Sequence, residues 1–319
     1  MGKQQRADMR IAVLAGGISD EREISLASGR HAEEALIEAG YGTVDLVDPG
    51  EDGFLSRLSD GGYDVAFLAL HGHGGEDGMV QDILEFLHIP YTGSNPISCG
   101  CAMDKDLSKL LYERAGLPIA PSVTFTRETI PSIEEIVSAV GEQSFVKPVV
   151  NGSSYGISLV RGSSELTKAI ELAFEFDNKV MVERRVVGTE VTCGVLGDGE
   201  TLRALPVVEI CMPEQSEFYD LDVKYIDPTD IHRIPARLAP DMYRRVQELA
   251  CRAHRALGCF GFSRTDIIVG QEGPIILETN NIPGMTPTSL FPDEVVHAGM
   301  TFADACAELI ELALNRAAR

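Results

Sequence analysis

The chain has 319 residues, of which 44% are hydrophobic and 24% charged, and its 49 acidic side chains outnumber 27 Lys and Arg for a net charge of −22. This composition is typical of a globular protein of about two domains that buries its core without disulfides or structural metals. We expect no nucleic-acid partner and no membrane partner, because both select an excess of Lys and Arg. No apolar run approaches the ~20 residues that span a bilayer.

Seven cysteines are spread along the chain, and only Cys99 and Cys101 lie close together. That pair lacks the spacing of metal ligands, and the other five have apolar or helical surroundings, which favours buried, reduced thiols. The first ten residues are polar and basic, without the apolar stretch of a secretory signal. We therefore expect a reducing, cytoplasmic location.

The first 95 residues alternate predicted strands with predicted helices. Short apolar runs predict strands at 10–15, 43–47 and 64–70. Apolar residues at helical spacing predict helices at 23–39 and 79–87. This order predicts a small doubly wound α/β domain. Its ligands are expected beyond the carboxyl ends of the strands, at the loops 16–23 and 71–78.

After residue 95 the pattern of predicted strands and helices changes. We predict helices at 104–115, 132–140, 163–174 and 240–257 and at the C-terminus. We predict strands at 122–125, 144–150, 179–183, 263–269 and 274–280, with a strand-rich stretch that ends at residue 210. A polar loop is predicted over 211–233.

A lysine in an apolar strand precedes a turn rich in Gly and Ser. Lys147 lies in SFVKPVV, and Gly152, Ser153, Ser154 and Gly156 follow it. Free backbone N–H groups and hydroxyls in such a turn suit phosphate oxygens, although the order of a Walker A loop is absent. The alternative is a plain turn, preceded by a lysine whose ammonium reaches outward to solvent.

Acidic and amide groups gather on the two late strands. Arg264 and Asp266 share one face of the first strand, and Glu278 and Asn280 share one face of the second, because side chains alternate along a strand. If the strands are neighbours, three oxygen ligands lie beside a guanidinium, which favours Mg²⁺. A surface hairpin with scattered charge is the alternative, and the apolar residues between these groups argue against it.

Three loops carry weaker signals. Gly284, after a proline, frees a backbone N–H, and Ser289 near a predicted helix start suits a carboxylate, although turns of this type are common. His71 and His73 lack a third ligand at the spacing of a zinc site. Glu21 follows a glycine-rich turn, where an acidic residue can also simply stabilise a helix start.

Taken together, these segments resemble the D-alanine–D-alanine ligases of the ATP-grasp superfamily. The matching motifs are GGISDEREISLASG (16–29), LHGHGGEDGMVQ (70–81), IPYTGS (89–94), MDK (103–105), KPVVNGSSYGIS (147–158), VGTEVT (187–192), FYDLDVKY (218–225), RTD (264–266) and ETNNIPGMTPTSL (278–290). They follow the order of the family and span nearly the whole chain. The resemblance implies an N-terminal doubly wound α/β domain at 1–95 and a two-part ATP-grasp fold, with a central subdomain at 96–186 and a C-terminal subdomain at 187–319.

The resemblance also implies an activity. Members of this family phosphorylate the carboxylate of one D-alanine with ATP, and the amine of a second D-alanine attacks the acyl phosphate to form D-alanyl-D-alanine for peptidoglycan. ATP and two Mg²⁺ ions, with Mn²⁺ as a substitute, are the implied cofactors. A homodimer formed through the first domain is the implied assembly.

Individual residues match the ligand positions of the family. The positions for ATP are Lys105, Lys147, Ser154, Glu183, the backbone near Val186, Glu190 and Lys224. The positions for the two metal ions are Asp266, Glu278 and Asn280. The metal positions coincide with those that the strand alternation predicts.

Catalytic and substrate-binding roles follow from the same resemblance. The positions concerned are Glu21, His71, Ser153, Tyr225, Arg264, Gly284, Ser289 and Leu290. Glu21 matches the acceptor of the first ammonium, with His71 near that substrate. Ser153 and Tyr225 match the pair that ties a mobile loop to Glu21, and the loop 211–233 would be the lid that excludes water.

The remaining residues match positions that bind negative charge, either on the oxyanion or on the second substrate. Arg264 and the Gly284 N–H match the groups that stabilise the oxyanion. Ser289, with the N–H of Leu290, matches the site for the carboxylate of the second D-alanine.

Three positions depart from the family pattern. Asn151 stands where Glu is usual, Leu221 replaces a Tyr, and Asn281 replaces a common Thr. Tyr225 favours an amine as the second substrate. Two alternatives follow, namely a relative that uses D-lactate or D-serine as acceptor and a nucleotide-binding relative without catalysis.

Overall fold

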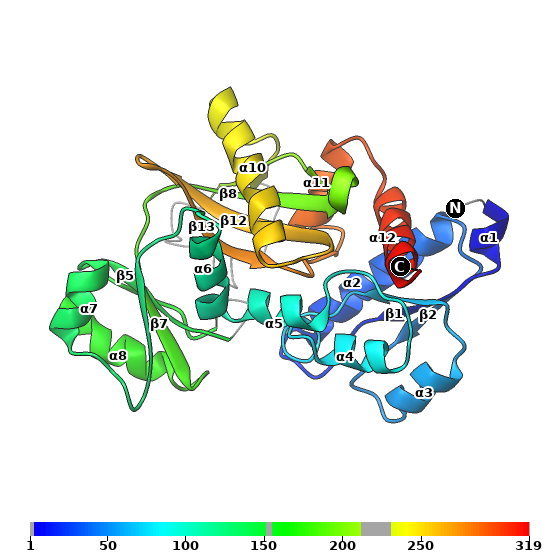
Figure 1. Cartoon of the computed structure of the whole chain (residues 1–319), viewed down its shortest axis with the longest axis horizontal. Coiled ribbons are helices and arrows are strands. Elements are labelled where there is room, and N and C mark those ends of the chain that lie inside the picture. The colour runs from blue at the N-terminus through cyan, green and yellow to red at the C-terminus, as the bar shows by residue number, and fades with distance from the viewer. Residues whose placement is uncertain (1–2, 151–154, 212–230, 319) are drawn as a thin grey trace.

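The computed structural model describes residues 3–150, 155–211 and 231–318. Within these ranges the strands form three sheets, arranged as an N-terminal unit, a central unit and a larger C-terminal unit (Figure 1). None of the helices in the described ranges is long and apolar enough to cross a bilayer.

The N-terminal unit contains a parallel sheet of order β2-β1-β3. Its strands are β1 (Arg10–Leu14), β2 (Thr43–Val47) and β3 (Val65–Leu68). Its helices are α1 (Lys3–Ala7), α2 (Arg22–Glu38), α3 (Phe54–Asp60) and α4 (Met79–Phe86). The apolar runs of β1 and β3 are buried, as expected for parallel strands covered by helices. The predicted α/β unit is confirmed. The helices α1 and α3 were not predicted, because they are too short to show a clear apolar periodicity.

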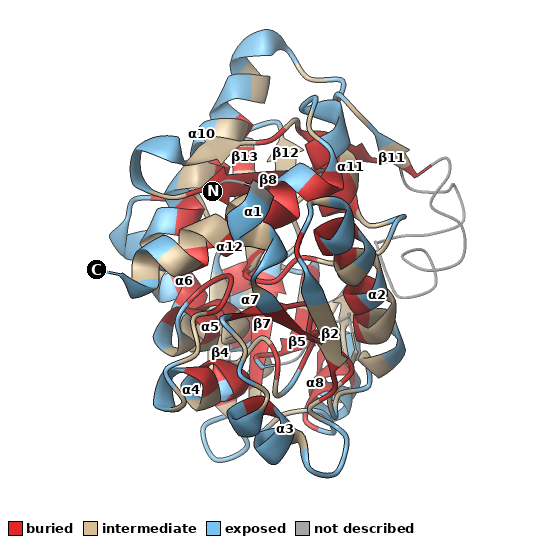
Figure 2. Ribbon diagram, turned by 90° about the vertical axis from the view of Figure 1, so that its right-hand side faces the viewer, coloured by how far each residue is buried: buried red, intermediate tan, exposed pale blue. Residues whose placement is uncertain are grey.

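The central unit is an antiparallel sheet of order β4-β7-β5-β6 with helices packed on it. Its strands are β4 (Ser122–Thr126), β5 (Ser144–Pro148), β6 (Ser158–Val160) and β7 (Lys179–Arg184). Its helices are α7 (Ile133–Val140) and α8 (Ser163–Ala173), and α7 begins at a capping box between Ser132 and Glu135. Figure 2 shows β5 and β7 largely buried.

The C-terminal unit is an antiparallel sheet of order β11-β10-β8-β12-β13, with β9 paired to β8. Its strands are β8 (Gly188–Gly197), β9 (Arg203–Ala204), β10 (Val208–Ile210), β11 (His232–Arg233), β12 (Gly261–Gly270) and β13 (Gly273–Asn280), and η1 is a short 3₁₀ helix (Gly199–Thr201). The predicted polar loop is wrong at its end, because His232 and Arg233 pair with β10. A two-residue strand is defined by its partner and has no periodicity of its own.

The remaining helices connect or cover these sheets. They are α5 (Pro96–Met103), α6 (Lys105–Arg114), α10 (Pro240–Ala256), α11 (Leu290–His297) and α12 (Phe302–Ala317). Helix α12 lies beside α2 (Figure 1) and shares a hydrophobic core with the N-terminal sheet. The core beside α10 instead includes residues of α6. The predicted domain boundaries at residues 95 and 186 stay predictions. Each of these two hydrophobic cores contains residues from two of the three predicted domains.

A fully buried carboxyl group of α11 binds a backbone N–H of strand β8. Glu294 Oε1 accepts the N–H of Gly194 at 2.7 Å, and Oε2 has no hydrogen-bond partner among the described residues. A Cβ atom at Gly194 would lie 2.3 Å from Glu294 Oε2, so any other residue would have to displace the carboxyl group. Burial, opposed by the Gly194 N–H, raises the pKa of Glu294 to about 8.

This shift predicts a stability that falls as the pH rises. The unfolded chain loses the Glu294 proton near the ordinary pKa of 4.5, whereas the folded chain keeps it to about pH 8. Between these values the folded state binds one more proton, so its free energy of unfolding drops by ~1.4 kcal/mol per pH unit from this group. Glu294→Gln removes the ionisation. In urea unfolding, the free energy of unfolding of the variant relative to that of the wild type should therefore increase from about pH 6 to 8. The control is Glu308→Gln, at a partly exposed carboxylate, and a pH-independent difference between Glu294→Gln and wild type would contradict the prediction.

Candidate active site

A cavity of about 520 Å³ lies between the central sheet and the C-terminal sheet. Lys147 on β5 and Glu183 on β7 line one part, and Asp266 on β12 and Glu278 on β13 line another. The cavity brings together the described residues that were predicted to bind ATP, which are Lys105, Lys147, Glu183, Val186 and Glu190. Segments more than a hundred positions apart thus share one cleft.

A buried carboxylate at this cleft is held by two lysines. Glu183 Oε2 accepts from Lys147 Nζ at 2.5 Å, and Glu183 Oε1 is paired with Lys109 of α6. Burial acts to raise the pKa of Glu183, but the two ammonium groups outweigh it and hold that pKa below its usual range. Burial also lowers the pKa of Lys109, although the carboxylate opposes it. The burial of Lys109 was not predicted from the sequence, because nothing in the pattern of a charged helix distinguishes a buried lysine from an exposed one.

The acidic and basic groups of β12 and β13 lie together as the alternation predicted. The two strands are antiparallel neighbours, with Arg264 opposite Asn280 and Asp266 opposite Glu278. Arg264 donates through Nε to Asp266 Oδ1 and through Nη2 to Asp266 Oδ2, both at 3.0 Å. Asn280 Nδ2 lies 3.4 Å from Asp266 Oδ2, and Lys105 Nζ lies 3.6 Å from Glu278 Oε2. One face of this strand pair therefore combines oxygen donors with positive charge.

This donor set fits a hard cation that binds together with phosphate. Two carboxylates and an amide supply only oxygen, which Mg²⁺ prefers, and Mg²⁺ completes its coordination with phosphate and water oxygens. Among the described residues, no group of three or more His, Cys, Asp or Glu side chains forms a self-contained metal site. His73 is instead engaged with Asp77, 2.7 Å from its Nδ1.

The loop after β13 ends at the start of α11. Ser289 is the N-cap residue of that helix, and Leu290 is its first residue, so the free N–H groups of a helix start lie here. Ser289 Oγ accepts the N–H of Thr286 at 3.0 Å. A Cβ atom at Gly284 would lie 3.0 Å from Ser289 Oγ, so a side chain there would crowd the serine hydroxyl. The loop thus presents a hydroxyl and backbone donors, a suitable arrangement for anionic groups.

One carboxyl group near this loop was not singled out from the sequence. Glu76 Oε2 accepts the N–H of Gly72 at 2.7 Å. Burial, followed by the negative charge of Glu21, raises the pKa of Glu76 to about 8, while Arg264 opposes the shift. Asn281, one of the departures from the family pattern, donates to the backbone carbonyl of Glu76 at 3.0 Å. The motif LHGHGGEDGMVQ contains Glu76, but only the fold reveals that this carboxyl lies near the other acids Glu21 and Glu278.

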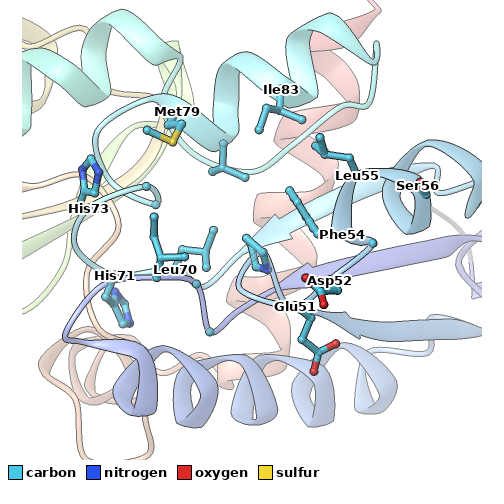
Figure 3. Close-up of a pocket in the computed structure, with 18 residues that line it drawn as sticks. Glu51, Asp52, Phe54, Leu55, Ser56, Leu70, His71, His73, Met79 and Ile83 are labelled. Atoms are coloured by element: carbon cyan, nitrogen blue, oxygen red, sulfur yellow. The ribbon is translucent and has the colours of Figure 1, made fainter.

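A second cavity, of about 500 Å³, lies within the N-terminal unit. Figure 3 shows Phe54 of α3 and Met79 and Ile83 of α4 around it, with Leu70 and His71 from the segment after β3 on another side. The glycine-rich turn after β1 also lines it. The expected position of a ligand beyond the carboxyl ends of parallel strands therefore coincides with a real opening.

Several predicted residues belong to segments outside the described ranges. Ser153, Ser154, Lys224 and Tyr225 lie outside the described residues, as do Asn151 and Leu221 and nearly all of the predicted lid at 211–233. Their assignments stay predictions.

Comparisons with known proteins agree with this architecture. Residues 111–311 match the model of the D-ala D-ala ligase C-terminus, and residues 52–94 match that of the D-ala D-ala ligase N-terminus. The D-alanine–D-alanine ligase of Syntrophobacter fumaroxidans is 44% identical, covering 96% of this chain and 98% of the relative. That of Desulforamulus reducens is 40% identical, covering 97% and 99%.

Solved structures give the same result. The crystal structure of D-alanine–D-alanine ligase from Bacillus anthracis matches with a TM-score of 0.83 and 32% identity, covering 97% of this chain and 99% of that one. A structure of the same enzyme complexed with ATP has a TM-score of 0.82 and 29% identity, covering 97% and 98%. With both family models matched in order and nearly full-length relatives at 44% and 40% identity, this chain belongs to the D-alanine–D-alanine ligase family.

Proposed function

We propose that this protein joins two D-alanine molecules into D-alanyl-D-alanine for peptidoglycan precursors, with conversion of ATP to ADP and phosphate. The observation that carries the proposal is the cleft in which Lys105 and Lys147 meet the Asp266–Glu278 strand pair, with Arg264 bound to Asp266. The names of the full-length relatives and the ATP complex of the Bacillus anthracis enzyme support the same activity.

The first half-reaction brings a carboxylate and a triphosphate into one site. A chain with a net charge of −22 must supply positive charge locally, and Lys105 and Lys147 are assigned to the ATP phosphates. Glu183 orients Lys147 through their buried ion pair. The ribose is assigned to Glu190, and the adenine to the segment around Val186 and Glu183.

Asp266, Glu278 and Asn280 would hold two Mg²⁺ ions, or Mn²⁺ in their place. When bound, these ions neutralise charge on the phosphoryl group that is transferred. Arg264 keeps Asp266 in place through its two hydrogen bonds, and Lys105 does the same for Glu278 through their ion pair.

In the second half-reaction the amine of the second D-alanine attacks the acyl phosphate, and the tetrahedral intermediate expels phosphate. The Arg264 guanidinium and the Gly284 N–H are assigned to the developing oxyanion. Ser289 and the N–H of Leu290 are assigned to the carboxylate of the second D-alanine, at a helix start that favours anions. Glu21 is assigned to the ammonium of the first.

We also propose a cytoplasmic homodimer. All seven cysteines lie within the described ranges and are free thiols, which accords with a reducing compartment. Phe86 on α4 and Ile97 on α5 are 85% and 79% exposed. Helix α4 belongs to the N-terminal unit, and α5 packs beside α4. Exposed apolar side chains of this kind are what a subunit interface covers.

Mass-resolved product analysis tests the activity and its acceptor. The protein is incubated with ATP, Mg²⁺ and D-alanine, alone and with D-lactate or D-serine. D-Alanyl-D-alanine is expected as the dominant product in every mixture, with ADP released in equal amount. A dominant mixed product would reassign the acceptor, and ATP binding without any product would indicate a non-catalytic relative. EDTA should abolish the reaction, and added Mg²⁺ should restore it.

A further inference from the structure

Ser28, on the buried side of α2, joins two parts of the site that are far apart in the sequence. Its Oγ lies 2.9 Å from Nε2 of His71, which follows β3, and accepts the N–H of Met285 at 3.3 Å. Ser28 and Met285 are 0% exposed and His71 is 5% exposed, so water does not compete for these contacts. One helical turn later, His31 Nδ1 lies 2.7 Å from the Met285 carbonyl oxygen. Helix α2 therefore holds both backbone polar groups of the residue next to Gly284.

The chemistry of the partners decides where each proton lies. The Met285 amide can only donate, so it occupies one of the two lone pairs of Ser28 Oγ, and the hydroxyl proton is available to Nε2 of His71. The backbone of Ile282 also interacts with the imidazole and raises the pKa of His71, as expected for a carbonyl that accepts from a ring N–H. These contacts favour the neutral Nδ1–H tautomer of His71. Burial, opposed by the bond to Ile282, lowers the pKa of His71 to about 4, so the ring stays neutral at physiological pH.

We propose that Ser28 is a positioning residue that acts through His71 and the Met285 amide to fix the backbone at Gly284. The proposal rests on the proposed ligase activity, in which the Gly284 N–H faces the oxyanion. His71 is then a structural support between the first-substrate loop and the oxyanion loop, without a role in proton transfer. Loss of the Ser28 hydroxyl would leave a buried donor and a buried acceptor without that partner, and the two loops would no longer share a fixed contact.

Steady-state kinetics of Ser28→Ala tests this role. We expect kcat to fall about 10- to 100-fold, because a small misplacement of an oxyanion donor has that effect. The KM for ATP should stay within about twofold, since Lys105 and Lys147 are untouched. The pH profile should keep its shape and move only downward, because no titrating group is lost. A kcat equal to that of the wild type would overturn the proposal.

A matched control separates positioning from general loss of stability. Ser263 Oγ lies 2.8 Å from Nδ1 of buried His254, so Ser263→Ala breaks a buried Ser–His contact of the same kind. Ser263 points to the opposite face of β12 from Arg264, toward α10. The control should keep kcat close to wild type at a similar loss of thermal stability. An equal fall of kcat in both variants would assign the effect to stability and overturn the proposal.

The tautomer can be measured without any variant and without turnover. ¹⁵N NMR of the full-length protein labelled at histidine should show His71 with a protonated Nδ1 and an unprotonated Nε2, without titration between about pH 5.5 and 9. A protonated Nε2, or a titration near neutral pH, would overturn the assignment. Absence of dipeptide product from the wild-type protein would instead refute the proposed function. The NMR spectrum would still show whether the Ser28–His71 hydrogen bond is present, because it does not depend on turnover.

Discussion

Replacing Arg264 with alanine is expected to lower kcat by about 10²- to 10³-fold, the loss typical of removing one oxyanion donor. The guanidinium also binds both oxygens of Asp266 at 3.0 Å, so its removal frees a carboxylate assigned to the metal ions. Arg264→Lys keeps the charge but loses the planar fork that spans two oxygens. It should therefore recover only part of the lost activity.

The measurement is the rate of ADP release with D-alanine at saturating ATP. Arg203→Ala is the matched control, because Arg203 makes a similar two-point contact with Glu308, both at 2.7 Å. Arg203 lies on β9 opposite Leu196 of β8, whereas the assigned metal ligand Asp266 lies opposite Thr192. We expect that control to retain kcat. If Arg264→Ala keeps kcat within about threefold of wild type, Arg264 does not face the developing charge.

Replacing Glu183 with glutamine is expected to destabilise the protein by about 3–5 kcal/mol, the usual cost of removing one partner from a buried ion pair. The change keeps the shape of the side chain and removes the charge that compensates Lys109 and Lys147. Both ammonium groups are nearly inaccessible to water, with side-chain exposures of 7% and 11%. The variant should also bind ATP more weakly, because Lys147 loses the contact that orients it.

Urea unfolding and a second substitution test the cause. Lys109→Met in the Glu183→Gln background removes one of the two uncompensated charges and should recover part of the lost stability. Glu308→Gln, in a more exposed pair with Arg203, should change the free energy of unfolding by less than about 1 kcal/mol. If Glu183→Gln is no more destabilising than Glu308→Gln, the buried pair does not support the cleft.

Local patterns predicted most of the elements and part of the site. Alternation along β12 and β13 placed Arg264, Asp266, Glu278 and Asn280 on one face, and the register of the two strands agrees. This inference succeeded because the direction of a side chain in a strand depends only on its position along that strand. The same reasoning could not find β11, which exists only through its pairing with β10.

The sequence by itself determined where most of the strands and helices run and which loops carry Gly, Ser and charge at their ends, because apolar periodicity and turn residues act over a few positions. Only the tertiary structure decided the contacts between distant segments. Lys109 and Glu183 are 74 positions apart, Gly194 and Glu294 are 100 apart, and Ser28 and Met285 are 257 apart. In each case a buried polar group must find its partner within hydrogen-bond distance, and which partner it finds depends on how the helices and sheets pack.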